Sequence, residues 1–188
     1  MAKHAVCPWW IGYLLASPVR KYFQDPVHIL SSYVRAGMSV LEPGPGMGFF
    51  TLEIARLVGP SGRVVAVDAQ PQMIEGLKRR ARKAGLLDRI DARVARAESM
   101  ALGDLDGAID FTFAFAVVHE MPSAAHFFDE ATRVMKPDAS LLLAEPAGHV
   151  GESEFAQQLA AASEYGLQVI DRPSVSRCVA AVLSRKSR

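Results

Sequence analysis

The most restrictive feature of this sequence is a glycine-dense turn between two apolar stretches. Residues 40–48 read Val-Leu-Glu-Pro-Gly-Pro-Gly-Met-Gly, and a second apolar stretch, residues 64–67, ends at Asp68. A strand that enters such a turn, a helix after it and a second strand that ends on an acid form the opening of a nucleotide-binding βαβ unit. We therefore expect Asp68 at the carboxyl end of its strand, where a carboxylate can accept two hydrogen bonds from a ribose diol.

The spacing of the glycines separates two cofactor classes. With Gly44 and Gly46 as the first two glycines, the dinucleotide fingerprint G-x-G-x-x-G requires glycine at position 49, where this chain has Phe49. The run is instead E-x-G-x-G-x-G, from Glu42 to Gly48. Glycine loops also arise as plain tight turns, and the acid could be an exposed strand end or a helix cap. The strand, helix and acid around this loop favour a ligand site over those alternatives.

The remaining sequence alternates strand and helix patterns. Strands are predicted at 39–42, 64–68, 90–95, 110–117, 141–145, 167–171 and 176–183, and helices at 49–58, 71–84, 123–135 and 152–165. Residues 1–36 look helical in two pieces, the second of which begins at Asp25-Pro26. The alternation predicts a parallel sheet covered on both faces. Only residues 172–175 separate the last two strands, so these must form an antiparallel hairpin. Residues 136–139 are expected to form a turn before the fifth strand.

The glycine loop, Asp68 and the seven-strand pattern together resemble the class I S-adenosylmethionine (SAM)-dependent methyltransferases. Within them, the similarity is to the type 11 and ubiquinone/menaquinone-biosynthesis-like group, and it covers about residues 37–184. The resemblance implies an α/β fold with a doubly wound, mostly parallel seven-stranded sheet and an antiparallel last strand. It also implies SAM as methyl donor, S-adenosylhomocysteine as product and a small-molecule acceptor. We divide the chain into an N-terminal helical lid segment, 1–36, and a SAM-binding methyltransferase domain, 37–188.

The cofactor site is expected outside the carboxyl ends of the strands, where the strand order of an open α/β sheet reverses. By the resemblance, the glycine loop would contact the methionine part of SAM, and Asp68 the ribose hydroxyls. Many members of the family carry an aspartate after the third strand that accepts the adenine amino group. This chain has Arg96 there, and Glu98 either replaces the aspartate or is a surface acid. The expected cofactor-binding residues are Glu42, Gly44, Gly46, Gly48, Asp68, Ala69, Ala97, Glu98 and Ala116.

The candidate catalytic residues follow the fourth and fifth strands. Methyl transfer from a sulfonium is an in-line displacement, so the protein mainly aligns the acceptor and excludes water. A base is needed only if the acceptor must lose a proton. His119 and Glu120 are the best-placed candidates, with Glu145 and His149 behind them, although a histidine there can also cap or pack. His126 falls inside a predicted helix and is interpreted as structural.

Cover for the acceptor is expected from the N-terminal segment, because no large insertion interrupts the strand and helix pattern. Trp9, Trp10 and Tyr13 would form an aromatic lid, or equally a hydrophobic plug or a dimer contact. His4 and Cys7 hint at a soft metal or metalloid substrate, but the two cysteines of the chain lie at opposite ends. Thiolate-rich coordination generally needs more ligands, so we expect no metal site.

Composition narrows the partners and the compartment. Hydrophobic residues make up 50% of the chain, as in an ordinary globular core, and the net charge of +1 gives no field that would recruit nucleic acid. The densest basic run, residues 78–83, is interpreted as the solvated face of a helix. The apolar run 6–16 is too short for a membrane span and lacks a signal-peptide cleavage site. We expect a cytoplasmic monomer or homodimer without a nucleic-acid partner.

Two other functions stay open. The missing adenine aspartate is compatible with a protein that binds SAM without transferring its methyl group. A nicotinamide-dependent oxidoreductase is disfavoured by Phe49, which stands where the dinucleotide fingerprint needs glycine.

Overall fold

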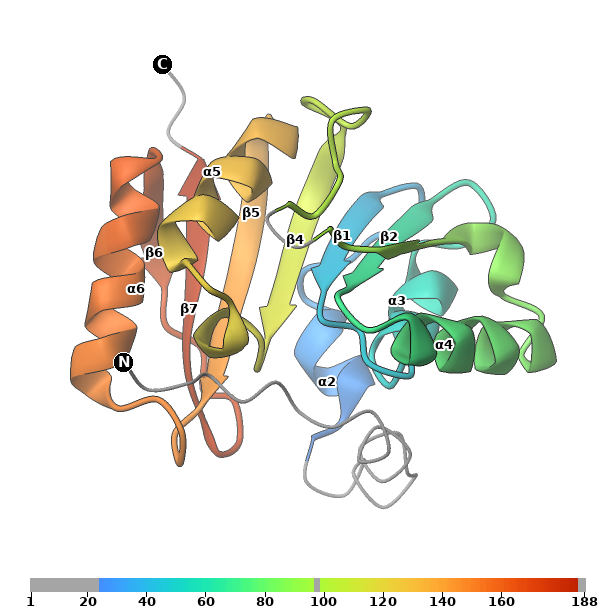
Figure 1. Ribbon diagram of the computed structural model, residues 1–188, viewed down its shortest axis with the longest axis horizontal. Helices are drawn as coiled ribbons and strands as arrows, with labels where there is room; N and C mark the ends of the chain where they lie inside the picture. The colour runs from blue at the N-terminus through green and yellow to red at the C-terminus, as the bar shows by residue number, and fades with distance from the viewer. Residues whose placement is uncertain (1–23, 97–98, 186–188) are drawn as a thin grey trace. The chain divides into compact units, whose positions relative to one another are not determined.

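The computed structural model describes residues 24–96 and 99–185 (Figure 1). Their strands form a seven-stranded sheet in the order β3-β2-β1-β4-β5-β7-β6. The pairs β1–β2, β2–β3 and β4–β5 are parallel, and β7 runs antiparallel to both of its neighbours. The predicted α/β fold class, with its mostly parallel sheet and antiparallel last strand, is therefore confirmed. The strands are β1 (Ser39–Pro43), β2 (Arg63–Asp68), β3 (Ile90–Val94), β4 (Ile109–Phe115), β5 (Met135–Pro146), β6 (Leu167–Asp171) and β7 (Cys178–Arg185).

Helices occupy the predicted intervals between the strands. A further helix precedes β1: there Asp25 accepts a hydrogen bond from the Val27 N–H through Oδ1 at 2.9 Å, and Pro26 takes the first helical position, as the Asp-Pro signal predicts. None of the described helices is long and apolar enough to cross a membrane. The α-helices are α2 (Pro26–Leu30), α3 (Thr51–Leu57), α4 (Pro71–Lys83), α5 (Ala124–Val134) and α6 (Glu152–Glu164), and the 3-10 helices include η2 (Leu87–Arg89) and η3 (Val118–Glu120).

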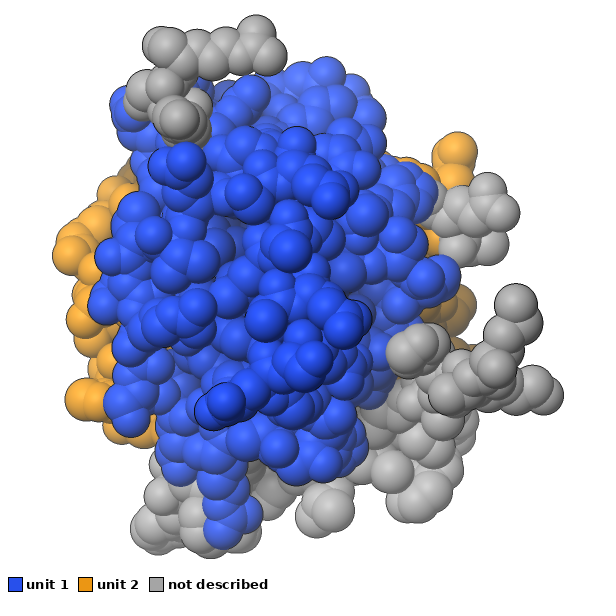
Figure 2. All heavy atoms as spheres, turned by 90° about the vertical axis from the view of Figure 1, so that its left-hand side faces the viewer, with its two compact units in different colours: residues 1–6, 102–188 blue, residues 7–101 orange. Residues whose placement is uncertain are grey.

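The described residues group into two compact units, which Figure 2 distinguishes by colour. The orange unit contains β1 to β3 with α2 to α4 and ends at Ala101. The blue unit begins its described part at Leu102 and contains β4 to β7 with α5 and α6. Most of the proposed lid segment, residues 1–23, lies outside the described residues. The division into a lid segment and a domain at residue 36 therefore stays a prediction.

The orange unit is a small parallel sheet with helices packed against it. Its central strand β2 is buried from Val64 to Asp68, a continuous run that is typical of parallel strands covered on both faces. Helix α3 packs against β2, and α4 packs against β2 and β3. The apolar side chains of α4 that are buried in this core are Met73, Ile74, Leu77 and Ala81, which share one face of the helix.

The basic run on α4 is only partly the solvated face that its sequence predicts. Arg79, Arg82 and Lys83 are exposed, but Arg80 is half-buried and its guanidinium donates a hydrogen bond to the Met47 carbonyl in the glycine loop. Burial lowers the pKa of Arg80. For Arg80 the solvated-face interpretation is wrong, because this side chain ties α4 to the loop.

The blue unit has its core on β4 and β5. Phe111, Phe113 and Leu142 are fully or almost fully buried, and α5 packs against α6, which in turn packs against β6 (Figure 1). The turn expected at residues 136–139 is wrong, because these residues belong to β5. The β4–β5 register shifts between Ile109 and Phe111, so the extra residues of β5 are accommodated as an irregularity inside the strand.

Candidate functional site

The glycine loop joins β1 to α3 and is built on left-handed backbone. Gly44, Gly46 and Gly48 have φ angles of +66°, +54° and +84°. The Gly44 N–H donates to the Val67 carbonyl at 2.9 Å, and the Gly48 N–H to the Pro45 carbonyl at 2.9 Å. Such angles are unfavourable for residues that carry a Cβ, which explains the glycines at these positions.

Two of these glycines have different surroundings. A Cβ on Gly48 would overlap the side chain of Leu77 on α4, whereas a Cβ on Gly46 would meet no atom within 4 Å. Gly48 is therefore needed for packing the loop against α4. Gly46 borders open space, as a residue in contact with a ligand must. Glu42, at the end of β1, is only 3% exposed.

Asp68 ends β2 and is hydrogen-bonded to the loop. Its Oδ2 accepts from the Gly46 N–H at 3.1 Å and its Oδ1 from the Gln70 N–H at 2.9 Å, with the residue 9% exposed. Burial raises the pKa of Asp68, and the two backbone hydrogen bonds oppose that rise. Asp68 is thus neither an exposed acid nor the cap of α4, whose N-cap is Gln70. Each carboxylate oxygen keeps a lone pair for a further donor.

The predicted cofactor residues after Asp68 that the structure describes are more exposed than Asp68. Ala69 is exposed directly after Asp68. Ala116 follows β4 with a φ of +54°, a conformation uncommon for alanine, and its N–H donates to the Ala144 carbonyl at 2.8 Å. Arg96 is exposed and its N–H donates to the Ser99 carbonyl at 2.8 Å. The predicted residues Ala97, Glu98, His4, Cys7, Trp9, Trp10 and Tyr13 lie outside the described residues.

A histidine–glutamate pair lies after β4 and at the end of β5. His119, in η3, has its Nδ1 2.5 Å from Oε2 of Glu145. The other carboxylate oxygen, Oε1, accepts from the N–H groups of Val118 at 2.8 Å and His119 at 3.2 Å. The Glu145 side chain is fully buried, and that of His119 is 14% exposed. His119, Glu120 and Glu145 are all candidates from the sequence, and the carboxylate that His119 bonds is Glu145.

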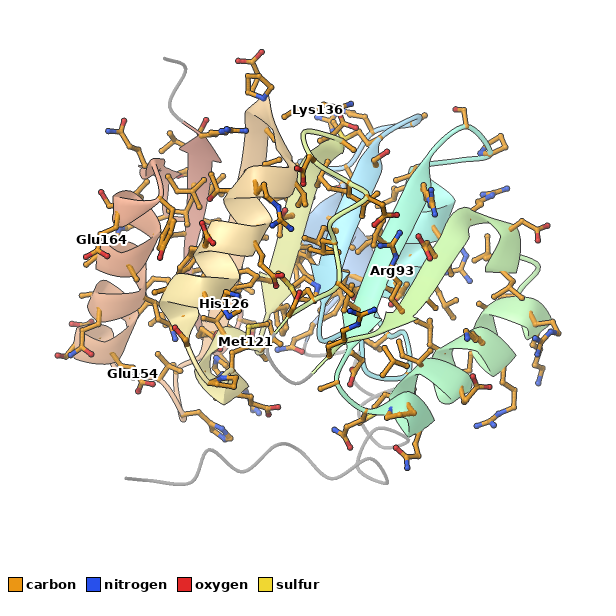
Figure 3. The ribbon with its side chains drawn as sticks, turned by 45° about the horizontal axis from the view of Figure 1, so that its top comes forward. Arg93, Met121, His126, Lys136, Glu154 and Glu164 are labelled. Atoms are coloured by element: carbon orange, nitrogen blue, oxygen red, sulfur yellow. The ribbon has the colours of Figure 1, made fainter. Side chains whose placement is uncertain are left out.

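The surroundings of His119 favour its charged form. The hydrogen bond to Glu145 raises the pKa of His119, burial opposes this, and the charges of Glu145, Glu120 and Glu154 add to the rise. The His149 ring packs edge-on against His119 at 5.7 Å between centroids. Figure 3 labels Glu154 on α6 and His126 on α5; His126 lies inside α5 and is exposed.

Metal-binding side chains are not clustered in the described ranges. No group of three or more His, Cys, Asp or Glu in residues 24–96 and 99–185 could hold a metal ion. Cys178 is half-buried.

The fold is that of known methyltransferases. A SAM-dependent methyltransferase from Aquifex aeolicus superposes with a TM-score of 0.85 at 26% identity, over 95% of this chain and 99% of the other. The [4+2]-cyclase SpnF superposes with a TM-score of 0.70 at 19% identity, over 85% and 80% of the two chains, which shows a shared fold alone. The fold and the glycine loop together define the chain as a class I methyltransferase.

Sequence comparison gives the same family. Residues 34–183 match the family described as methyltransferase domain, and the chain belongs to that family. It is 34% identical over 115 residues to the ubiquinone/menaquinone biosynthesis C-methyltransferase UbiE of Hahella chejuensis, covering 61% of this chain and 45% of the relative. A 37.1 kDa transposon protein of Streptomyces fradiae is 31% identical over 112 residues, covering 60% and 31%. The chain spans less than half the length of these curated relatives.

Proposed function

We infer that this protein transfers a methyl group from SAM to a small-molecule acceptor. The observation that carries the proposal is the Asp68 carboxylate, which is buried beside the glycine loop and bonded to the Gly46 N–H. A carboxylate that fixes the loop and still has lone pairs available suits a ribose diol. Membership of the methyltransferase domain family supports the same donor.

The loop and Asp68 have the properties that a SAM site requires. The open space at Gly46 leaves room for the methionine part of the donor against the loop, and Glu42 and Gly44 complete this side. We assign the ribose to Asp68 and Ala69, and we keep Ala97, Glu98 and Ala116 as proposed cofactor-binding residues. When bound, SAM supplies an electrophilic methyl group on a sulfonium.

For the acceptor we propose an aromatic quinol. The support is the similarity to UbiE enzymes, which are C-methyltransferases of ubiquinone and menaquinone biosynthesis. The short spacing of the elements after β4 and β5 leaves no large insertion to bury a macromolecular acceptor. As parts of the same proposal we keep a cytoplasmic location, based on the two widely separated cysteines, and a monomeric or homodimeric state.

Ligand-induced stabilisation tests the donor class. A ligand at 100 times its dissociation constant adds about 2.7 kcal/mol to the free energy of unfolding, which for this chain length raises the melting temperature by about 5–10 °C. We expect that shift with SAM and with S-adenosylhomocysteine, measured by differential scanning fluorimetry. A comparable shift with NAD or NADP, and none with SAM, would contradict the proposal.

A second candidate is a SAM-binding protein that transfers nothing. It rests on Arg96, which stands where many family members have the adenine aspartate. Both candidates predict the SAM shift, so the distinction comes from turnover. Formation of S-adenosylhomocysteine with 1,4-dihydroxynaphthalene as probe acceptor supports transfer, and SAM binding without turnover on a panel of quinols, phenols and amines favours the binding protein.

The aromatic lid can be tested through its own fluorescence. Trp9 and Trp10 are the only tryptophans of the chain, so the intrinsic emission reports on that segment alone. If residues 1–16 cover the acceptor, S-adenosylhomocysteine with the quinol probe is expected to shift the emission maximum. A Trp9→Ala, Trp10→Ala double variant is expected to keep SAM binding and lose transfer. Undiminished transfer in that variant would leave the cluster as packing or a dimer contact.

A further inference from the structure

The pair formed by His119 and Glu145 has the arrangement of a general base and its orienting carboxylate. We propose that His119 accepts a proton from a hydroxyl-bearing acceptor and that Glu145 is the positioning residue that holds its imidazole for this task. The proposal rests on the methyltransferase activity inferred above. It specifies the acceptor as one whose hydroxyl must ionise, such as a phenol or a quinol, rather than a thiolate or an uncharged amine.

The hydrogen bonds fix which imidazole nitrogen can take the proton. With Glu145 ionised, its Oε2 is an acceptor only, so the nitrogen 2.5 Å away, Nδ1, must carry a hydrogen. In the neutral ring the lone pair then lies on Nε2. Glu145 itself is fixed by the two N–H groups that bond Oε1, from Val118 and His119, and its side chain is fully buried. Because the His119 side chain is 14% exposed, an acceptor can reach it.

Acidic side chains from three elements act on this histidine. Glu145 comes from β5, Glu120 from η3 and Glu154 from α6, while the ring of His149 in the segment after β5 packs edge-on. Helix α5 also packs against η3, but none of its groups is among the charges that move this pKa. Together the three carboxylates raise the pKa of His119. A raised pKa makes the neutral imidazole a stronger base. It also means that a higher pH is needed before the imidazole is neutral and can accept a proton.

The proposed step balances as follows. The hydroxyl proton of the acceptor moves to Nε2 of His119, whose imidazolium is stabilised by the Glu145 carboxylate. An electron pair of the resulting oxyanion, or of the ring carbon conjugated to it, forms the bond to the methyl carbon. If the ring carbon is methylated, its hydrogen then leaves to water as a proton and the oxygen regains a proton, which restores the aromatic ring. The sulfur–methyl bond breaks with its electron pair on sulfur, which leaves S-adenosylhomocysteine. The imidazolium then releases its proton to water.

The first test needs no acceptor, so it is independent of the proposed activity. Long-range ¹H–¹⁵N NMR of the full chain reports the tautomer of each neutral histidine. We expect His119 with its proton on Nδ1 in the native protein. In Glu145→Gln the amide can still accept the two backbone hydrogen bonds through its oxygen, but its nitrogen donates toward Nδ1, so the proton moves to Nε2. A native His119 protonated on Nε2 overturns the proposal.

The second test follows the rate with pH, with 1,4-dihydroxynaphthalene and SAM at saturation. As pH rises through the pKa of His119, kcat is expected to rise, because only the neutral ring accepts a proton. Glu145→Gln is expected to lower kcat by about 10²-fold to 10⁴-fold and to move this limb to lower pH, with little change in KM for SAM. His126→Gln, which changes an exposed histidine on α5, is the matched control and is expected to leave the profile unchanged.

The opposite dependence of the rate on pH would identify a different role for His119 and Glu145. If His119 anchors an anionic acceptor as an imidazolium, the rate falls as pH rises through its pKa, and the proposal is overturned. A Glu145→Gln protein with native kcat and an unmoved limb overturns it as well. Failure of the SAM melting shift instead removes the methyltransferase activity and leaves the NMR result on the histidine standing, so the two failures are distinguishable.

Discussion

Replacing Asp68 with alanine is expected to weaken SAM binding by roughly tenfold to a hundredfold in a protein that still folds. Hydrogen bonds to a charged group contribute about 1.5–3 kcal/mol, which corresponds to that range of dissociation constants. Asp68 is 9% exposed and bonds the Gly46 N–H, so its loss removes the proposed ribose acceptor and also the hydrogen bond that holds the loop. Isothermal titration calorimetry with SAM and S-adenosylhomocysteine measures the change directly.

A matched control for this experiment is the acid at the end of another strand. Asp171 ends β6, is exposed, and accepts a local hydrogen bond from the Arg172 N–H. Asp171→Ala is expected to bind SAM as the native protein does. Native affinity in a folded Asp68→Ala protein would show that Asp68 serves the loop structure alone.

The Gly48→Ala variant is expected to lose about 2–5 kcal/mol of folding stability. A left-handed backbone costs a residue with a Cβ about 1–2 kcal/mol, and an added methyl group in a well-packed core costs about 1–3 kcal/mol. Both costs apply here, because φ is +84° and the new Cβ overlaps Leu77, which is fully buried. Urea unfolding followed by circular dichroism measures the loss as a lower midpoint at unchanged slope.

The neighbouring glycine provides the comparison that separates packing from binding. In Gly46→Ala the φ of +54° is also unfavourable, but the Cβ meets nothing within 4 Å, so only the backbone cost of about 1–2 kcal/mol applies. This variant is expected to be the more stable of the two and to bind SAM more weakly than the native protein. Equal stability of the two variants would mean that Leu77 moves aside without cost.

The parts of the fold that sequence predicts well depend on local signals. The strand that ends at Asp68 reads as an unbroken apolar run, and the helix at Pro26 carries its own cap and proline. The antiparallel last pair follows from the short connection between β6 and β7. Fold class and glycine loop were therefore accessible, since each depends on residues that lie close together in the chain.

The errors arise where distant residues meet. Pro137 suggests a turn, but its segment lies inside β5, at the register shift between the pairs Ile109–Met135 and Phe111–Ser140. The sequence groups Arg80 with the solvent-exposed basic residues of α4, although its guanidinium bonds the carbonyl of a residue 33 positions away. His119 and Glu145 are both candidates from the sequence, but they are 26 positions apart and no local pattern indicates that they bond each other. The one available signal was that Glu145 directly follows the apolar residues 141–144 of its strand, where an unpartnered acid would be costly.

The hydrogen bond between Asp68 and Gly46 fixes the glycine loop through groups of the protein itself, which matters for the kinetics of ligand binding. A loop already held in shape by a buried carboxylate loses little conformational entropy when a ligand arrives. Association then needs no prior rearrangement of the loop. Ligands that share the nucleoside, such as the donor and its demethylated product, would then have similar association rate constants. The protein would discriminate between them through their dissociation rate constants.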